Sequence, residues 1–148
     1  MAQAEPTVAV EREVRIDASP ETVLAFFTDP DKMTRWKGSS AELDARPGGV
    51  YRVDISDRAV AIGEYVEVDP PVRVVFTWGW DGDEHVPPGS STVEVTLTPD
   101  GDGTVVRLLH RDLPAHAAPR HQEGWDHFLP RLQVAAAGGD PGPDPRAG

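Results

Sequence analysis

The sequence contains no cysteine among its 148 residues. This absence excludes disulfide bonds, thiolate metal sites and a cysteine nucleophile. Basic residues are also scarce, because 14 lysines and arginines stand against 25 aspartates and glutamates, and the formal net charge is −11. A field of that sign repels phosphate backbones, so we expect no nucleic-acid partner.

Long apolar runs are absent as well. No segment approaches the roughly 20 apolar residues that cross a bilayer, so we expect no membrane insertion. The first ten residues, MAQAEPTVAV, lack the basic patch and apolar stretch of a secretory signal. Hydrophobic residues make up 39% and charged residues 26%, which is typical of a globular chain. These features predict a cytoplasmic protein with a single folded domain.

Hydrophobic periodicity predicts an α+β fold. Residues 8–17 alternate as a half-buried strand, and residues 19–36 carry the capping signals of two short helices. Residues 41–111 show strand alternation interrupted by turns. Residues 121–136 place an apolar stripe at helical spacing. We therefore expect a curved antiparallel sheet of about six to seven strands wrapped around a long C-terminal helix.

The domain boundaries follow from composition. We expect residues 1–7 to be disordered, residues 8–136 to form one domain, and the Pro/Gly-rich residues 137–148 to form a disordered tail.

Four segments, in this order, carry a resemblance to a known group of proteins: VEREVRIDASPETVLAFFTDPDKMTRWKG, GEYVEVDPPVRVVFTWGW, STVEVTLTPDGDGTVVRLLHRDL and HQEGWDHFLPRL. The chain resembles the START-like (SRPBCC) superfamily, whose fold is called helix-grip. Within it, the chain is similar to the branch named after the activators of heat-shock-protein ATPase. The resemblance implies a cavity between the sheet and the last helix that often takes an apolar ligand.

Tryptophan is the unusual component of this sequence. Trp78 and Trp80 fall on one face of a predicted strand, and Trp125 lies on the stripe of the last helix. We expect Trp78 and Trp125 to line a cavity, with Trp80 at its rim. The other aromatic and histidine candidates for ligand binding are Trp36, Phe76, Tyr51, His121 and Phe128.

Glu64 and His110 are the polar candidates on predicted inward faces. Glu64 shares the alternation of Val60, Ile62, Val66 and Val68, which we predict to face the core. His110 extends the row of Val106 and Leu108, although Val105 and Leu109 make the opposite face equally apolar and leave its direction open. Either group, if buried, would orient a polar part of a ligand or act as a general base.

Three functions are consistent with these features. The leading hypothesis is non-enzymatic binding of a hydrophobic or aromatic small molecule, such as a lipid, without a cofactor. The first alternative is an aromatase/cyclase-like (polyketide cyclase-like) or hydrolytic enzyme that uses Glu64 or His110. The second is a stress-related co-chaperone or interaction domain that contacts a protein partner, and a homodimer is also left open. The histidine spacing fits no metal motif, so we expect no metal site.

Overall fold

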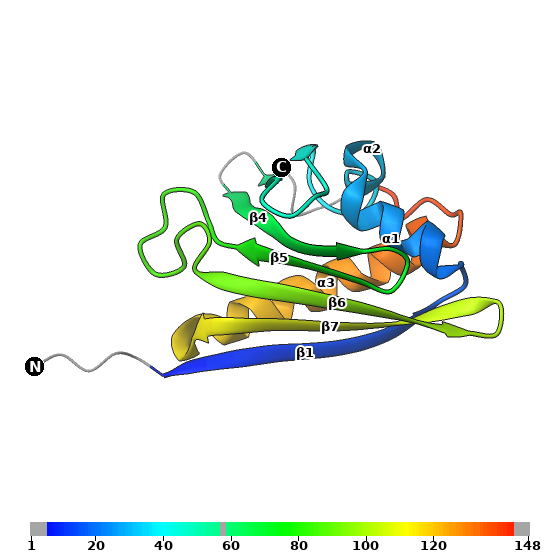
Figure 1. The fold of residues 1–148 in the computed structure, drawn as a ribbon. Helices are drawn as coiled ribbons and strands as arrows, with labels where there is room; N and C mark the ends of the chain where they lie inside the picture. Colours follow the sequence, from blue (N-terminus) through cyan, green and yellow to red (C-terminus); the bar gives the residue numbers. More distant parts are fainter. Residues whose placement is uncertain (1–5, 57–58, 144–148) are drawn as a thin grey trace, which may run out of the picture.

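A seven-stranded antiparallel sheet forms the frame of the protein in a computed structural model (Figure 1), which describes residues 6–56 and 59–143. The strand order is β1-β7-β6-β5-β4-β3-β2. The elements, in chain order, are β1 (Thr7–Ile16), α1 (Pro20–Thr28), α2 (Pro30–Met33), β2 (Ser40–Leu43), β3 (Val50–Ser56), β4 (Ala59–Asp69), β5 (Arg73–Trp78), β6 (Ser91–Asp100), β7 (Gly103–Pro114), a 3-10 turn (Ala115–Ala117) and α3 (Ala118–Ala136).

The sheet curves around the long helix α3, which lies behind β5, β6 and β7 in Figure 1. The apolar stripe of α3 is buried against the concave face through Trp125, Phe128, Leu129 and Leu132. A helix that is apolar along one side must cover that side, and the concave face of the sheet is the surface available to it. The predicted α+β architecture, with two short helices after the first strand, is confirmed.

The two short helices begin where the capping signals predict. The Ser19 side chain accepts a hydrogen bond from the backbone N–H of Thr22, and Asp29 accepts one from Asp31. Each cap is followed by proline at the first helical position, where the missing N–H costs nothing. Asp29 ends α1 and caps α2, so the chain turns sharply there.

The predicted inward face of β4 is wrong from Val60 to Val66, whereas Val68, which follows a register shift between Tyr65 and Glu67, packs against the core as predicted. Ala61 and Tyr65 are fully buried, whereas Glu64 and Val66 are exposed on the convex side. The alternation of aliphatic residues led to the wrong face because two positions on the inward face, Ala61 and Gly63, carry small residues. Gly63 has no room for a side chain, since a Cβ there would lie 1.8 Å from the Thr77 carbonyl oxygen. Tyr65 anchors the true inward face by donating a hydrogen bond from its hydroxyl to the carbonyl of Phe27 at 2.7 Å.

Hydrogen bonds from two arginines connect α3 to neighbouring segments. Arg12 on β1 donates two hydrogen bonds to Asp126 on α3, at 2.7 and 3.2 Å. Arg131 donates to the carbonyl of Trp36 at 3.2 Å and to the carbonyl of Gly142 at 2.9 Å. These bonds join the edge strand, the α2 region and the segment that follows α3 to one helix.

The structure describes only part of the segments that were predicted to be disordered at the two ends of the chain. β1 begins at Thr7, and residues 137–143 run on from α3. The rest of the predicted disordered ends, residues 1–5 and 144–148, lies outside the described residues.

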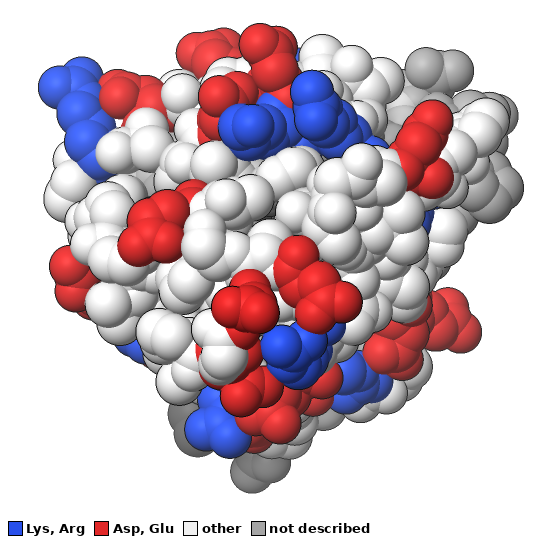
Figure 2. All heavy atoms as spheres, turned by 90° about the vertical axis from the view of Figure 1, so that its right-hand side faces the viewer, with Lys and Arg blue, Asp and Glu red and all other residues white. Residues whose placement is uncertain are grey.

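Acidic and basic side chains are interleaved on the face shown in Figure 2, in keeping with the many surface ion pairs between arginines and carboxylates. Exposed pairs of this kind contribute little to stability. Among the helices of the described residues, none has the length and apolar character to span a bilayer.

We expect Gly63→Ala to destabilise the protein by about 1 to 3 kcal/mol, because the added methyl group meets a backbone carbonyl that cannot move without separating β4 from β5. Gly124→Ala is the matched control. Gly124 lies inside α3 with open space around its Cβ position, so alanine there should stabilise by about 0.5 to 1 kcal/mol. Urea unfolding of both variants measures the difference, and equal stabilities would contradict the close packing at Gly63.

Candidate functional site

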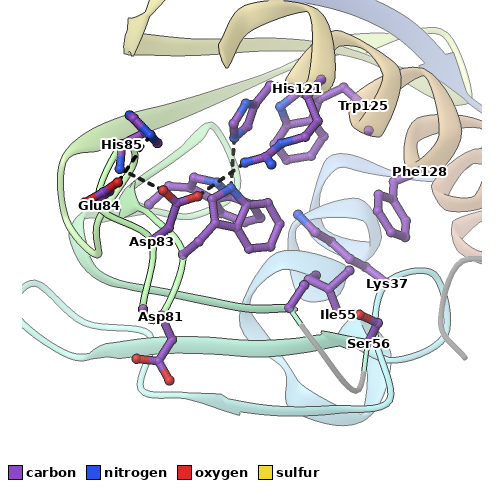
Figure 3. A pocket seen from close by; sticks show the side chains of 16 residues that line it. Lys37, Ile55, Ser56, Asp81, Asp83, Glu84, His85, His121, Trp125 and Phe128 are labelled. Carbon is purple, nitrogen blue, oxygen red and sulfur yellow. Dashed lines mark hydrogen bonds and ion pairs between the residues drawn. The ribbon is translucent and has the colours of Figure 1, made fainter. Parts of the chain in front are cut away.

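A cavity of about 650 Å³ lies between the sheet and α3 and opens to the surface. Its aromatic wall, as we call Trp78, Trp80, Trp125 and Phe128, comes from the end of β5 and from the inner face of α3. Ile55 and Ser56 of β3 also line the cavity, and the amine of Lys37, which follows α2, lies next to the rings of the aromatic wall. Segments distant in sequence therefore build one pocket (Figure 3).

The rings of the aromatic wall contact one another. Trp78 lies 5.2 Å from Trp80 and 5.9 Å from Trp125, measured between ring centroids. Such separations are those of favourable tilted and edge-to-face pairs. The indole N–H of Trp78 is buried and has no hydrogen-bond acceptor among the described residues. A donor without an acceptor costs stability, and unsatisfied donors of this kind gather at functional sites.

Lys37 is the unexpected member of the site. Its side chain extends toward Trp125 and Phe128 (Figure 3), and the residue is only 3% exposed. Its Nζ lies 4.0 Å from the centroid of Trp78 and 4.2 Å from that of Trp125. Burial lowers the pKa of the Lys37 amine well below its ordinary value, and no carboxylate in the described part of the chain opposes this shift.

His110 on β7 lies directly behind the aromatic wall and is fully buried. Trp125 donates a hydrogen bond from Nε1 to His110 Nδ1 at 3.1 Å. Since Nδ1 accepts, the proton of the neutral ring is on Nε2, which donates to Ser91 Oγ at 2.8 Å. Ser91 in turn donates to the carbonyl of Trp78 at 2.9 Å. This relay, Trp125–His110–Ser91–Trp78, connects the indole of Trp125 on α3 to the backbone of Trp78 on β5 through hydrogen bonds.

His121 on α3 makes the corresponding bond to Trp80. Trp80 Nε1 donates to His121 Nε2 at 3.1 Å, and His121 Nδ1 lies 2.8 Å from the Ala117 carbonyl, to which it donates in the neutral ring. Burial is the largest cause that lowers the pKa of both His110 and His121, and the charge on Lys37 adds to it. Both imidazoles are therefore neutral at pH 7.

The mouth loop, residues 81–89, closes one side of the opening. Asp83 Oδ1 accepts hydrogen bonds from the backbone N–H groups of His85 and Val86, and Oδ2 accepts one from Arg120 on α3 at 3.4 Å. The bond from His85 is the largest cause that lowers the pKa of Asp83. The loop is thus organised by one carboxylate and tied to the start of α3.

The structure brings five of the predicted ligand-binding residues to the cavity: Trp78, Trp80, His121, Trp125 and Phe128. Tyr51 and Phe76 lie beneath them in the core, with their rings stacked at 4.2 Å. Trp36 is also buried in the core, where its Nε1 donates a hydrogen bond to the Phe26 carbonyl at 3.0 Å. The prediction missed Lys37, Ser56 and the mouth loop. No local pattern distinguishes Lys37 from an exposed lysine.

The two catalytic candidates are not placed for base chemistry. Glu64 is exposed on the convex face, on the other side of the sheet from the cavity, so its predicted inward position is corrected. His110 points inward, but its two ring nitrogens are both engaged in the relay. Residues 6–56 and 59–143 contain no group of three potential metal ligands.

A curved antiparallel sheet that grips a C-terminal helix, with a cavity between them, defines an α+β protein of the helix-grip type. The chain belongs to the family of Activator of Hsp90 ATPase homolog 1-like proteins (AHSA1), whose model matches residues 17–137. This confirms the resemblance seen in the sequence.

Several solved structures are similar over most of the chain. An AHSA1-like protein from Rhizobium etli is 47% identical, with 100% of this chain and 94% of the other covered and a TM-score of 0.77. CalU16 from Micromonospora echinospora is 26% identical, with 97% and 88% covered and a TM-score of 0.73. An HSP90 activator from Plasmodium falciparum is 27% identical, with 85% and 94% covered and a TM-score of 0.71. A search of curated proteins found no match.

We expect the free energy of unfolding to decrease as the pH is lowered below about 6.5. The unfolded chain takes up protons at its histidines near their ordinary pKa of 6.5, whereas His110 and His121 in the folded chain resist protonation. The unfolded state then binds more protons, which costs up to about 1.4 kcal/mol per pH unit for each histidine. Urea unfolding between pH 5 and pH 8 (roughly the range in which histidine titrates) measures this slope.

The non-titrating variant His121→Gln tests the assignment. A glutamine amide can accept from Trp80 and donate to the Ala117 carbonyl, so its slope should be shallower than that of the wild type. A His121→Gln slope equal to that of the wild type would contradict the neutral buried ring.

We expect Lys37→Met to stabilise the protein by about 1 to 3 kcal/mol, because an apolar side chain of similar length removes a buried amine that has no compensating carboxylate. Lys32→Met, on a less buried lysine, should change stability by less than about 0.5 kcal/mol. Thermal or urea unfolding distinguishes the two, and a destabilised Lys37→Met variant would show that the amine is held favourably.

Proposed function

We propose that this protein binds an apolar, aromatic small molecule with one hydrogen-bond-accepting group in the cavity between the sheet and α3. The observation that carries the proposal is the composition of that cavity: indole and phenyl rings on one side and a single buried amine among them. Small-molecule sites are commonly apolar clefts with a few polar groups that fix orientation.

The size of the cavity suits a ligand of two or more fused rings. Its volume, about 650 Å³, falls in the range of roughly 300 to 1,000 Å³ that ligand pockets occupy. Burial of about 200 Å² of ligand apolar surface would contribute roughly 5 kcal/mol before the costs of association. Flat aromatic ligands would gain further from contact with the indole faces.

The polar groups favour a ligand that accepts a hydrogen bond. Lys37 Nζ is a donor in either protonation state, and its position between two indole rings leaves it without a protein acceptor among the described residues. A carbonyl or carboxylate oxygen on the ligand would supply one. The imidazoles of His110 and His121 are occupied by the tryptophan N–H groups and act by holding the aromatic wall in place.

The family does not by itself select this function. CalU16 and the Plasmodium falciparum HSP90 activator share the fold at 26% and 27% identity, and of these two the second alone is named for an activity. The proposal therefore depends on the cavity of this chain and on the buried amine that lines it.

The test is a titration of intrinsic tryptophan fluorescence with 2-naphthoic acid and naphthalene. We expect saturable quenching by both, with tighter binding of the acid. Gly124→Leu should weaken binding at least about tenfold, because Gly124 lines the cavity, its Cβ position has open space around it, and a leucine side chain there would take up room that the ligand needs.

The control for that variant is Gln122→Leu, an exposed position on the same helix, which should bind as the wild type does. Both substitutions leave the core unchanged, so loss of binding in Gly124→Leu alone identifies the cavity. Absence of quenching in the wild type, or equal binding by Gly124→Leu, would overturn the proposal.

A further inference from the structure

The surroundings of the Lys37 amine suit a second role besides orienting a ligand. It borders a cavity that is open to the surface. Its Nζ lies over the rings of Trp78 and Trp125, at 4.0 and 4.2 Å from their centroids. Its carbon chain is buried, and the residue as a whole is 3% exposed. A lysine is seldom buried so deeply without a carboxylate partner.

From this geometry we propose that Lys37 is a nucleophilic amine that forms a reversible imine with an aromatic aldehyde or ketone bound in the cavity. This inference rests on the proposed function, because the same cavity must first hold the carbonyl compound. It adds a covalent step and narrows the ligand class from hydrogen-bond acceptors in general to carbonyl compounds.

The step balances without a further reactant. The lone pair of Lys37 Nζ adds to the carbonyl carbon, and a proton moves from nitrogen to oxygen to give a carbinolamine. The C–O bond then breaks, the hydroxyl leaves with the remaining nitrogen proton as water, and a C=N bond forms. Water that enters through the mouth of the cavity reverses the reaction and returns the carbonyl compound.

Two features of the site favour this chemistry. Nucleophilic attack requires the neutral amine, and burial shifts Lys37 toward that form. A protonated imine is a cation, and the faces of Trp78 and Trp125 on either side would stabilise it. Lys37 interacts electrostatically with two titratable side chains, His110 and His121. Both imidazoles are neutral in the folded protein at pH 7.

The chain provides a clean internal comparison. Lys32 and Lys37 are its two lysines, and they are five residues apart. Lys32 lies near the ring of Phe26 at 5.5 Å and is partly exposed. Chymotryptic cleavage after Trp36 separates the two lysines, so each can be assigned by mass spectrometry.

The experiment treats the full chain at pH 7 with 2-naphthaldehyde and sodium cyanoborohydride, which reduces an imine to a stable secondary amine. We expect one naphthylmethyl group on Lys37, in at least about tenfold excess over Lys32, because for an amine whose pKa lies above 7 each unit by which the pKa is lowered raises the neutral fraction at pH 7 about tenfold. The alcohol 2-naphthalenemethanol, which fits the same space but cannot form an imine, should compete with this labelling.

Matched variants and a binding readout separate the two proposals. Lys37→Arg should lose the preferred label and Lys32→Arg should keep it, while quenching of tryptophan fluorescence by 2-naphthalenemethanol reports cavity binding in each. Quenching together with labelling spread evenly over all amines would overturn the imine and leave the binding function intact. Neither quenching nor preferred labelling in the wild type would overturn both.

Discussion

The hydrogen bond from Trp125 to His110 is the interaction on which the site depends. It crosses from α3 to the sheet inside the core, and it fixes the rotation of the helix about its own axis because the indole must reach the imidazole. Through Ser91 the same relay reaches the backbone of Trp78. Hydrophobic contact alone is non-directional, so the polar relay is what fixes the indole of Trp125 relative to the backbone of β5.

The site combines features that weaken the fold with features that strengthen it. An indole N–H without an acceptor and an amine without a carboxylate both carry a cost in stability, and both belong to residues that line the cavity. The surrounding core is densely aromatic, with Tyr51 stacked on Phe76 beneath Trp78. Such a foundation lets the protein keep unfavourable groups where a ligand would use them.

Much of the fold could be predicted from the sequence, since capping residues and alternation act locally. Ser19-Pro20 and Asp29-Pro30 mark helix starts by chemistry that involves only neighbouring residues. β4 was misread because its orientation is decided by Gly63, whose need for space comes from Thr77 on the next strand. Lys37 escaped notice for a related reason: its burial is created by Trp78 and Trp125, at distant positions in the chain.

The mouth loop is built differently from the cavity that it borders. Its shape depends on one carboxylate, Asp83, and on hydrogen bonds to its own backbone, whereas the aromatic wall is carried by a strand and a helix. Apart from Val86, which is fully buried in the core, substitutions in a loop of this kind disturb the core little. Changes of charge or size at the entrance are therefore separable from the interior, where the amine and the indoles are carried by the strand, the helix and the segment after α2.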